Sequence, residues 1–187
     1  MATEEPSYIV IEQAGNFELR AYDTMIVAET LVSGPMNEAS SAGFRIIADY
    51  IFGNNMSRTG SSEKISMTAP VTMKPESEKI SMTKPVVTEQ TGKQWRVHFV
   101  MPSRFSLDTL PTPNSPSVSL REVPAGNYAV VRFSGLVSDT KLASKTAELT
   151  AWLDSKGITP IGQPELARYN PPWTLPFLRR NEVMVAY

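Results

Sequence analysis

A short segment near the C-terminus, residues 171–178, combines three prolines with four large apolar side chains. The apolar residues, in chain order, are Trp173, Leu175, Phe177 and Leu178. Loops are normally polar and exposed, so this much apolar surface needs a cover. The segment either folds back over the protein or forms one wall of a binding cleft. In a cleft, Arg179 and Arg180, which follow at once, could meet an anionic group on an amphipathic ligand. One of these two arginines could instead pair with Glu182.

The opposite wall of such a cleft would come from an amphipathic helix expected over residues 37–51. Its apolar residues recur at helical spacing and form one stripe, made of Ala42, Ile46, Ile47, Tyr50 and Ile51. We expect the loop to pack toward Phe44 and two members of this stripe. The predicted ligand-binding residues are therefore Phe44, Ile47, Ile51, Trp173, Phe177, Arg179 and Arg180.

His98 is the only histidine in the chain and therefore the only imidazole that could ligate haem iron. It alternates with Trp95, Val97 and Phe99 along an expected strand, so it points to the face opposite that apolar set. If the apolar face lines the interior of the fold, His98 faces outward. We therefore expect a surface or packed histidine, and no metal site.

Composition excludes several classes of function. The chain has 187 residues and no cysteine, so disulfides, zinc–thiolate sites, iron–sulfur clusters and thiol catalysis are excluded. Its net charge is -1 and its 18 basic residues are dispersed, which does not favour nucleic acid as a partner. No apolar run approaches the ~20 residues of a membrane span. No enzyme motif is present, so we expect a cytoplasmic binding protein and not an enzyme.

An internal repeat indicates the fold. Residues 17–34 align without a gap on residues 118–135, at an offset of 101, with five identities. An expected helix follows each copy, over residues 37–51 and 138–155, and alternating strands follow each helix. We predict an α+β fold of two pseudo-symmetric β-α-β-β repeats that form a distorted antiparallel β-barrel flanked by two helices.

These elements fit one domain, residues 1–187, whose halves span about 8–101 and 118–187. A proline-rich linker, residues 102–117, joins the halves. A shorter repeat lies within the first half, where residues 62–68 recur unchanged as residues 77–83. Two identical alternating segments predict a hairpin or an extended edge.

Three motifs in order make a family comparison possible: KISMTAPV at residues 64–71, WRVHFVMP at 95–102, and YNPPW at 169–173 with RRNEV at 179–183. Together they resemble the SOUL family of haem-binding proteins, in a bacterial or plant-like form. The resemblance implies binding of haem or another tetrapyrrole in an apolar cleft beside the first helix and the C-terminal loop. It also implies that haem is not required for folding.

The basic residues proposed to pair with haem propionates in animal members have no counterpart here. The aligned positions hold Ser41 and Asp49 on the first helix and a residue near Thr174 in the C-terminal loop. The fold also resembles effector-binding domains of bacterial transcription regulators, which hold amphipathic small molecules. The alternatives to haem are therefore another amphipathic small molecule, or a protein partner that contacts the apolar loop.

Overall fold

The computed structural model describes residues 3–76, 94–171 and 173–187, and one antiparallel sheet of nine strands dominates it. Its strand order is β1-β2-β9-β11-β10-β5-β6-β3-β8. The strands are β1 Tyr8–Ala14, β2 Phe17–Tyr22, β3 Met25–Ser33, β5 Val71–Glu76, β6 Gln94–Val100, β8 Ser119–Val123, β9 Gly126–Phe133, β10 Ile161–Arg168 and β11 Asn181–Ala186. A separate two-stranded sheet pairs β4 (Asn55–Met56) with β7 (Thr112–Pro113). The short repeat at residues 77–83 lies outside the described residues.

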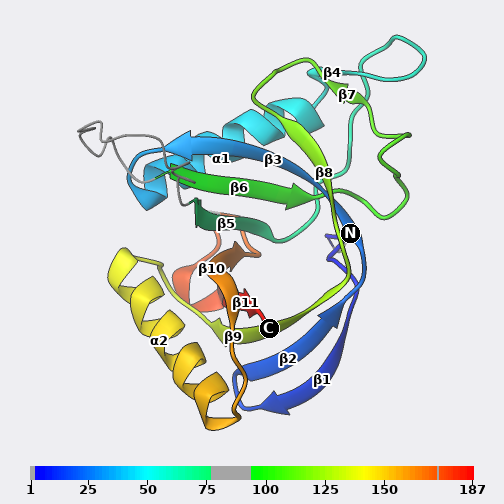
Figure 1. Ribbon diagram of the computed structural model, residues 1–187. Coiled ribbons are helices and arrows are strands. Elements are labelled where there is room, and N and C mark those ends of the chain that lie inside the picture. The colour runs from blue at the N-terminus through cyan, green and yellow to red at the C-terminus, as the bar shows by residue number, and fades with distance from the viewer. Residues whose placement is uncertain (1–2, 77–93, 172) are drawn as a thin grey trace, which may run out of the picture.

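The sheet curls strongly but does not close, so the predicted barrel is wrong in this respect (Figure 1). Within the described part of the chain, β1 and β8 are its two edges and no ladder joins them. Pro6 lies two residues before β1 and Pro124 directly follows β8. Proline has no amide hydrogen to contribute to a ladder, so neither residue can donate a hydrogen bond that would lengthen its edge strand.

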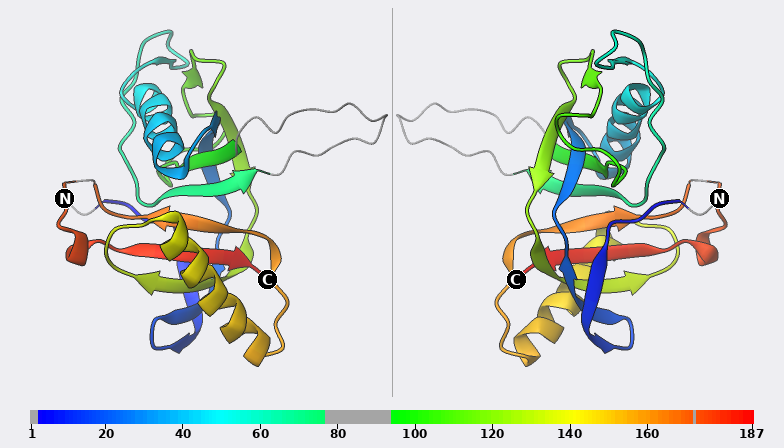
Figure 2. Two further views of the ribbon diagram at one scale, coloured as in Figure 1. Left: turned by 90° about the vertical axis from the view of Figure 1, so that its left-hand side faces the viewer. Right: turned by 90° about the vertical axis from the view of Figure 1, so that its right-hand side faces the viewer.

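Both helices cover the convex face of the curled sheet (Figure 2). Helix α1 (Met36–Ile51) packs on β3 and β6, and α2 (Asp139–Ser155) packs on β9 and β11. Ser138 caps α2, because its hydroxyl accepts a hydrogen bond from the Lys141 amide at 3.1 Å. Asn37 does not cap α1, which begins one residue earlier after Pro35.

Residues 65–73, in the alternating segment after the first helix, form a strand only at their C-terminal end. Strand β5 begins only at Val71, because the preceding residues bond elsewhere. The Ile65 amide donates to the Ile51 carbonyl at 2.9 Å, and the Ala69 amide donates to the Glu4 carbonyl at 2.8 Å. Residues 64–70 therefore run from the end of α1 to the sheet as an irregular connection.

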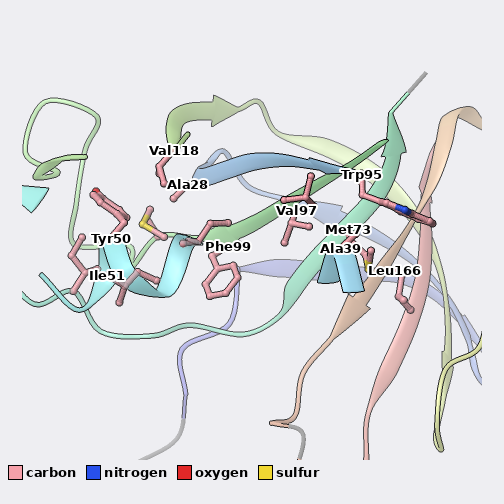
Figure 3. Close-up of a cluster of buried hydrophobic side chains, with 14 of the residues drawn as sticks. Ala28, Ala39, Tyr50, Ile51, Met73, Trp95, Val97, Phe99, Val118 and Leu166 are labelled. Carbon is pink, nitrogen blue, oxygen red and sulfur yellow. The ribbon is translucent and has the colours of Figure 1, made fainter. Parts of the chain in front are cut away.

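The main hydrophobic core lies between α1 and the convex face of the sheet (Figure 3). Side chains alternate along each strand, so Trp95, Val97 and Phe99 of β6 all point under the helix. Gly43 lets α1 approach closely, since a Cβ at this position would lie 2.7 Å from the Cβ of Val97. The opposite, concave face carries most of the buried charges, including Arg20 and Glu182.

Candidate functional site

The apolar loop predicted near the C-terminus does not fold back over the protein. Trp173 is 83% exposed and Phe177 is 69% exposed, and both neighbouring leucines are also exposed. The loop is nevertheless ordered by backbone contacts. A 3-10 turn spans Pro176–Leu178, and the Gly135 amide donates to the Pro176 carbonyl at 2.9 Å. Exposed Leu136 follows this contact. The apolar loop, defined here as residues 173–178, therefore presents an open apolar surface.

The three predicted residues of α1 are placed differently from one another. Phe44 is half-buried and its ring packs against Phe99, with 5.4 Å between the ring centroids. Ile47 and Ile51 have almost no exposed surface, because the apolar stripe of the helix packs onto the sheet. Of the three, Phe44 is the one with surface left for a ligand.

The two arginines after the apolar loop have separate structural contacts. The Arg179 Nε donates to the Thr174 carbonyl at 2.8 Å, which holds the base of the loop together. Arg180 forms ion pairs with Glu182 and Glu5, both at 2.9 Å, and lies over the Tyr169 ring. Burial alone would lower the pKa of Arg180, but Glu182 raises it above its ordinary value. The alternative in which one arginine pairs with Glu182 is thus the observed one for Arg180.

A third arginine, which sequence reasoning missed, lies beside the first turns of α1. Arg168 ends β10 on its convex side and reaches Asn37 Oδ1 at 3.1 Å and Ser40 Oγ at 3.4 Å. Its Nε is buried and has no hydrogen-bond partner among residues 3–76, 94–171 and 173–187. Burial lowers the pKa of Arg168, and nearby Arg179 lowers it further. The one sequence signal was the alternation that puts Arg168 on the same face as core residue Leu166.

His98 lies on the other side of the sheet from the apolar loop. It is buried at a cavity of about 100 Å³ on the concave face, whose walls include Lys74, Tyr128 and Glu165. Its Nδ1 has no hydrogen-bond partner in the described part of the chain. His98 lies on the face opposite Trp95, as expected, and of the two alternatives it is the packed histidine, because the Trp95 side of β6 packs under α1 and the opposite side faces this cavity.

We expect His98 to make stability depend on pH in mildly acidic solution. Burial lowers the pKa of His98 below the value of about 6.5 that it has in the unfolded chain. The unfolded state therefore binds a proton first, and the free energy of unfolding should fall as pH drops below about 6.5. In denaturant unfolding at several pH values, His98→Gln should have a flatter profile in this range. An unchanged slope would contradict the assignment.

An ionic network fills the concave face beside this cavity. The Arg20 guanidinium donates to both oxygens of Glu182, at 2.8 and 3.0 Å, and the Tyr169 hydroxyl donates to Glu182 at 2.8 Å. In the first half of the chain, Arg121 pairs with Glu29 at 3.0 Å. Arg20 and Arg121, which the repeat aligns, thus both form structural ion pairs, and Arg20 also pairs with the nearby Glu18 at 2.7 Å.

The described residues contain no cluster of three or more histidine, aspartate or glutamate side chains that could hold a metal ion. In the same part of the chain, neither helix has both the length and the apolar character needed to cross a bilayer.

Comparisons with solved structures relate this fold to other proteins. The crystal structure of the EcmrR C-terminal domain is similar with a TM-score of 0.64 and 13% identity, over 91% of this chain and 95% of that one. A hydrolase encoded by lin2189 from Listeria innocua is similar with a TM-score of 0.59 and 13% identity, over 91% of this chain and 90% of that one. Identities this low show a shared fold. No curated protein sequence matches the chain.

The family assignment rests on nearly the whole sequence. The family model described as SOUL heme-binding protein matches residues 3–186, which include α1, the apolar loop and Arg168. The chain therefore belongs to the SOUL family of haem-binding proteins.

Proposed function

We propose that this protein binds haem or a related tetrapyrrole on the apolar loop beside α1, without catalysis. The observation that carries the proposal is the exposure of Trp173 and Phe177 on an ordered loop of a SOUL-family protein. Single exposed apolar residues are ordinary, but a contiguous exposed group commonly marks a site of interaction.

The side chains present suit a flat ligand that is apolar at its centre and anionic at its edge. Trp173 and Phe177 would contact the macrocycle, and Phe44 would contribute its remaining exposed surface. Burial of the macrocycle would supply the driving force, at about 25 cal/mol per Å² of apolar surface. The family resemblance suggests haem, whose iron supplies redox or ligand-binding chemistry when bound. His98 is on the opposite face, so binding here requires no histidine ligand.

We further infer that the two halves are related by an approximate twofold repeat. The sequence offset of 101 aligns β2 with β8 and β3 with β9, and chain order makes β5 the counterpart of β10 and β6 the counterpart of β11. If every strand except β1 is replaced by its counterpart, the strand order of the sheet becomes its own reverse. The order supports a duplicated unit whose copies meet where β5 pairs with β10.

The proposal is tested by titrating the purified protein with hemin and following the Soret band. Trp173→Ala should weaken binding about tenfold, since losing roughly 60 Å² of contact removes about 1.5 kcal/mol. Ile161→Ala is a matched control, because Ile161 is 65% exposed at the far end of β10. Equal affinity of wild type and Trp173→Ala would exclude this site, and no saturable shift would exclude haem.

The second candidate is binding of a different amphipathic small molecule, and a cleft between the N-terminal segment, the start of β3 and the segment after β6 favours it. The cleft measures about 550 Å³ and is lined by apolar residues such as Met25, Ile26 and Phe105, and by Glu4 and Asp23. A ligand that binds the folded state raises the melting temperature. Thermal shift of wild type and Trp173→Ala separates the two candidates, because a ligand in this cleft should stabilise both proteins equally.

A further inference from the structure

We propose that Arg168 is the anchor for a carboxylate of the bound ligand, and that this anchor selects tetrapyrroles with free acid groups. The inference deepens the proposed function and rests on it. It assigns the polar part of the site to a residue of β10, not to the helix or to the two arginines that follow the apolar loop.

Arg168 is a half-buried charge, with its Nε fully buried, and its surroundings do not neutralise it. Its guanidinium bonds to two neutral side-chain oxygens, on Asn37 and Ser40. No carboxylate forms an ion pair with it among the residues that the structure describes. The charged group that acts on its pKa is another cation, Arg179. Buried charges in proteins are normally paired, because an unpaired ion loses its hydration without compensation.

Other arginines of this chain show the usual arrangement. Arg20 and Arg96 are each bonded to carboxylates, through Glu182 for the first and through Glu29 and Glu76 for the second. The protein therefore supplies acidic partners to other partly or fully buried arginines. Arg168 departs from this pattern where the end of β10 meets α1, two residues before the contact between Asn170 and Arg180 at the base of the apolar loop.

The unused donor of Arg168 is suited to an anion. Its Nε is buried without a partner among the residues described, and a guanidinium can present two parallel N–H groups to one carboxylate. Asn37 and Ser40 hold the side chain in position without using its charge. An incoming carboxylate would complete the hydrogen bonds of Arg168 and would offset the repulsion from Arg179.

The position of Arg168 limits the class of ligand. It lies two residues before Asn170, whose side chain accepts a hydrogen bond from the Arg180 amide at the base of the apolar loop. A molecule that reaches both places must carry an acid group at the edge of an apolar body. Tetrapyrroles with free propionates meet this condition, and the iron atom does not enter into it.

The test compares protoporphyrin IX with its dimethyl ester by quenching of tryptophan fluorescence. Wild type should bind the diacid at least about tenfold more tightly than the ester, as expected for a charge-assisted hydrogen bond. Arg168→Gln should lose this preference. Arg58→Gln removes the same charge from an exposed site beyond the other end of α1 and should keep it. A preference kept in Arg168→Gln would overturn the anchor.

Two further arms cover the remaining outcomes. If Arg168→Gln does not fold, Arg168→Lys keeps the charge without the planar fork, and a preference not reduced at least about threefold would overturn the proposal. If neither porphyrin binds wild type, the proposed function fails, and the anionic apolar dye 8-anilinonaphthalene-1-sulfonate tests the anchor alone. Weaker dye binding to Arg168→Gln than to Arg58→Gln would support the anchor, and equal binding would overturn it.

Discussion

Glu182→Gln should destabilise the protein by about 3–5 kcal/mol, because it leaves buried cations without their shared partner. The Glu182 carboxylate is fully buried and accepts hydrogen bonds from Arg20, Arg180 and Tyr169. The amide of glutamine preserves the shape but removes the charge. Chemical denaturation at neutral pH measures the difference in the free energy of unfolding.

The control for this variant is Glu5→Gln, which removes the exposed partner of the same Arg180. Exposed ion pairs contribute little, so this change should cost about 1 kcal/mol or less. Similar losses of unfolding free energy in the two variants would show that burial of the Glu182 charge does not determine its contribution to stability.

The same network should make the stability of the protein depend on pH in acidic solution. Burial alone would raise the pKa of Glu182, but the hydrogen bonds and charge of Arg20 outweigh this and hold it below the ordinary value. Its contribution to stability is therefore present above about pH 4.3, the unfolded value, and is lost as pH falls through the folded pKa. This acid-dependent loss should be smaller in Glu182→Gln.

Gly43→Ala should destabilise the protein by about 2 kcal/mol, through the contact between α1 and the sheet. Alanine is favoured over glycine inside a helix by about 1 kcal/mol. Here, however, the new methyl group would lie 2.7 Å from both Cβ and Cγ2 of Val97. The Cβ of Val97 is fixed by the strand, so the helix must move away from the sheet, and overpacking of this kind costs about 1–3 kcal/mol before any wider loss of packing.

Ser41→Ala is the control on the same helix, because Ser41 is exposed and its change should stay within about 0.5 kcal/mol. Thermal or denaturant unfolding of both variants gives the comparison. A Gly43→Ala protein at least as stable as wild type would mean that α1 can shift outward without loss of core packing.

Local patterns predicted the elements of this fold well. The alternation around His98 correctly gave a strand with Trp95, Val97 and Phe99 on one face, and Ser138 correctly marked the start of α2. Closure of the sheet was predicted wrongly. Periodicity shows which side chains share a face, but whether two distant edge strands meet depends on curvature accumulated over all nine strands.

The candidate site was predicted less completely, for a related reason. The apolar loop stands out in sequence because aromatic residues lie between prolines, and the structure exposes it. The stripe containing Ile47 and Ile51 was assigned to the ligand, yet an apolar stripe on a helix is what a sheet buries first. Arg168 was missed because its neighbours Asn37 and Ser40 are about 130 positions away in the chain, a proximity that only the fold creates.

The two faces of the curled sheet differ in chemistry, and this has a consequence for how such a protein can evolve. Leu166 and Arg168 of β10 turn toward the helices, whereas Glu165 of β10 and Tyr169, which follows it, line the concave side. Substitutions on opposite sides share few direct contacts, so their effects should add. A lineage can therefore diversify its recognition on the outer side while inheriting an unaltered ionic scaffold on the inner one.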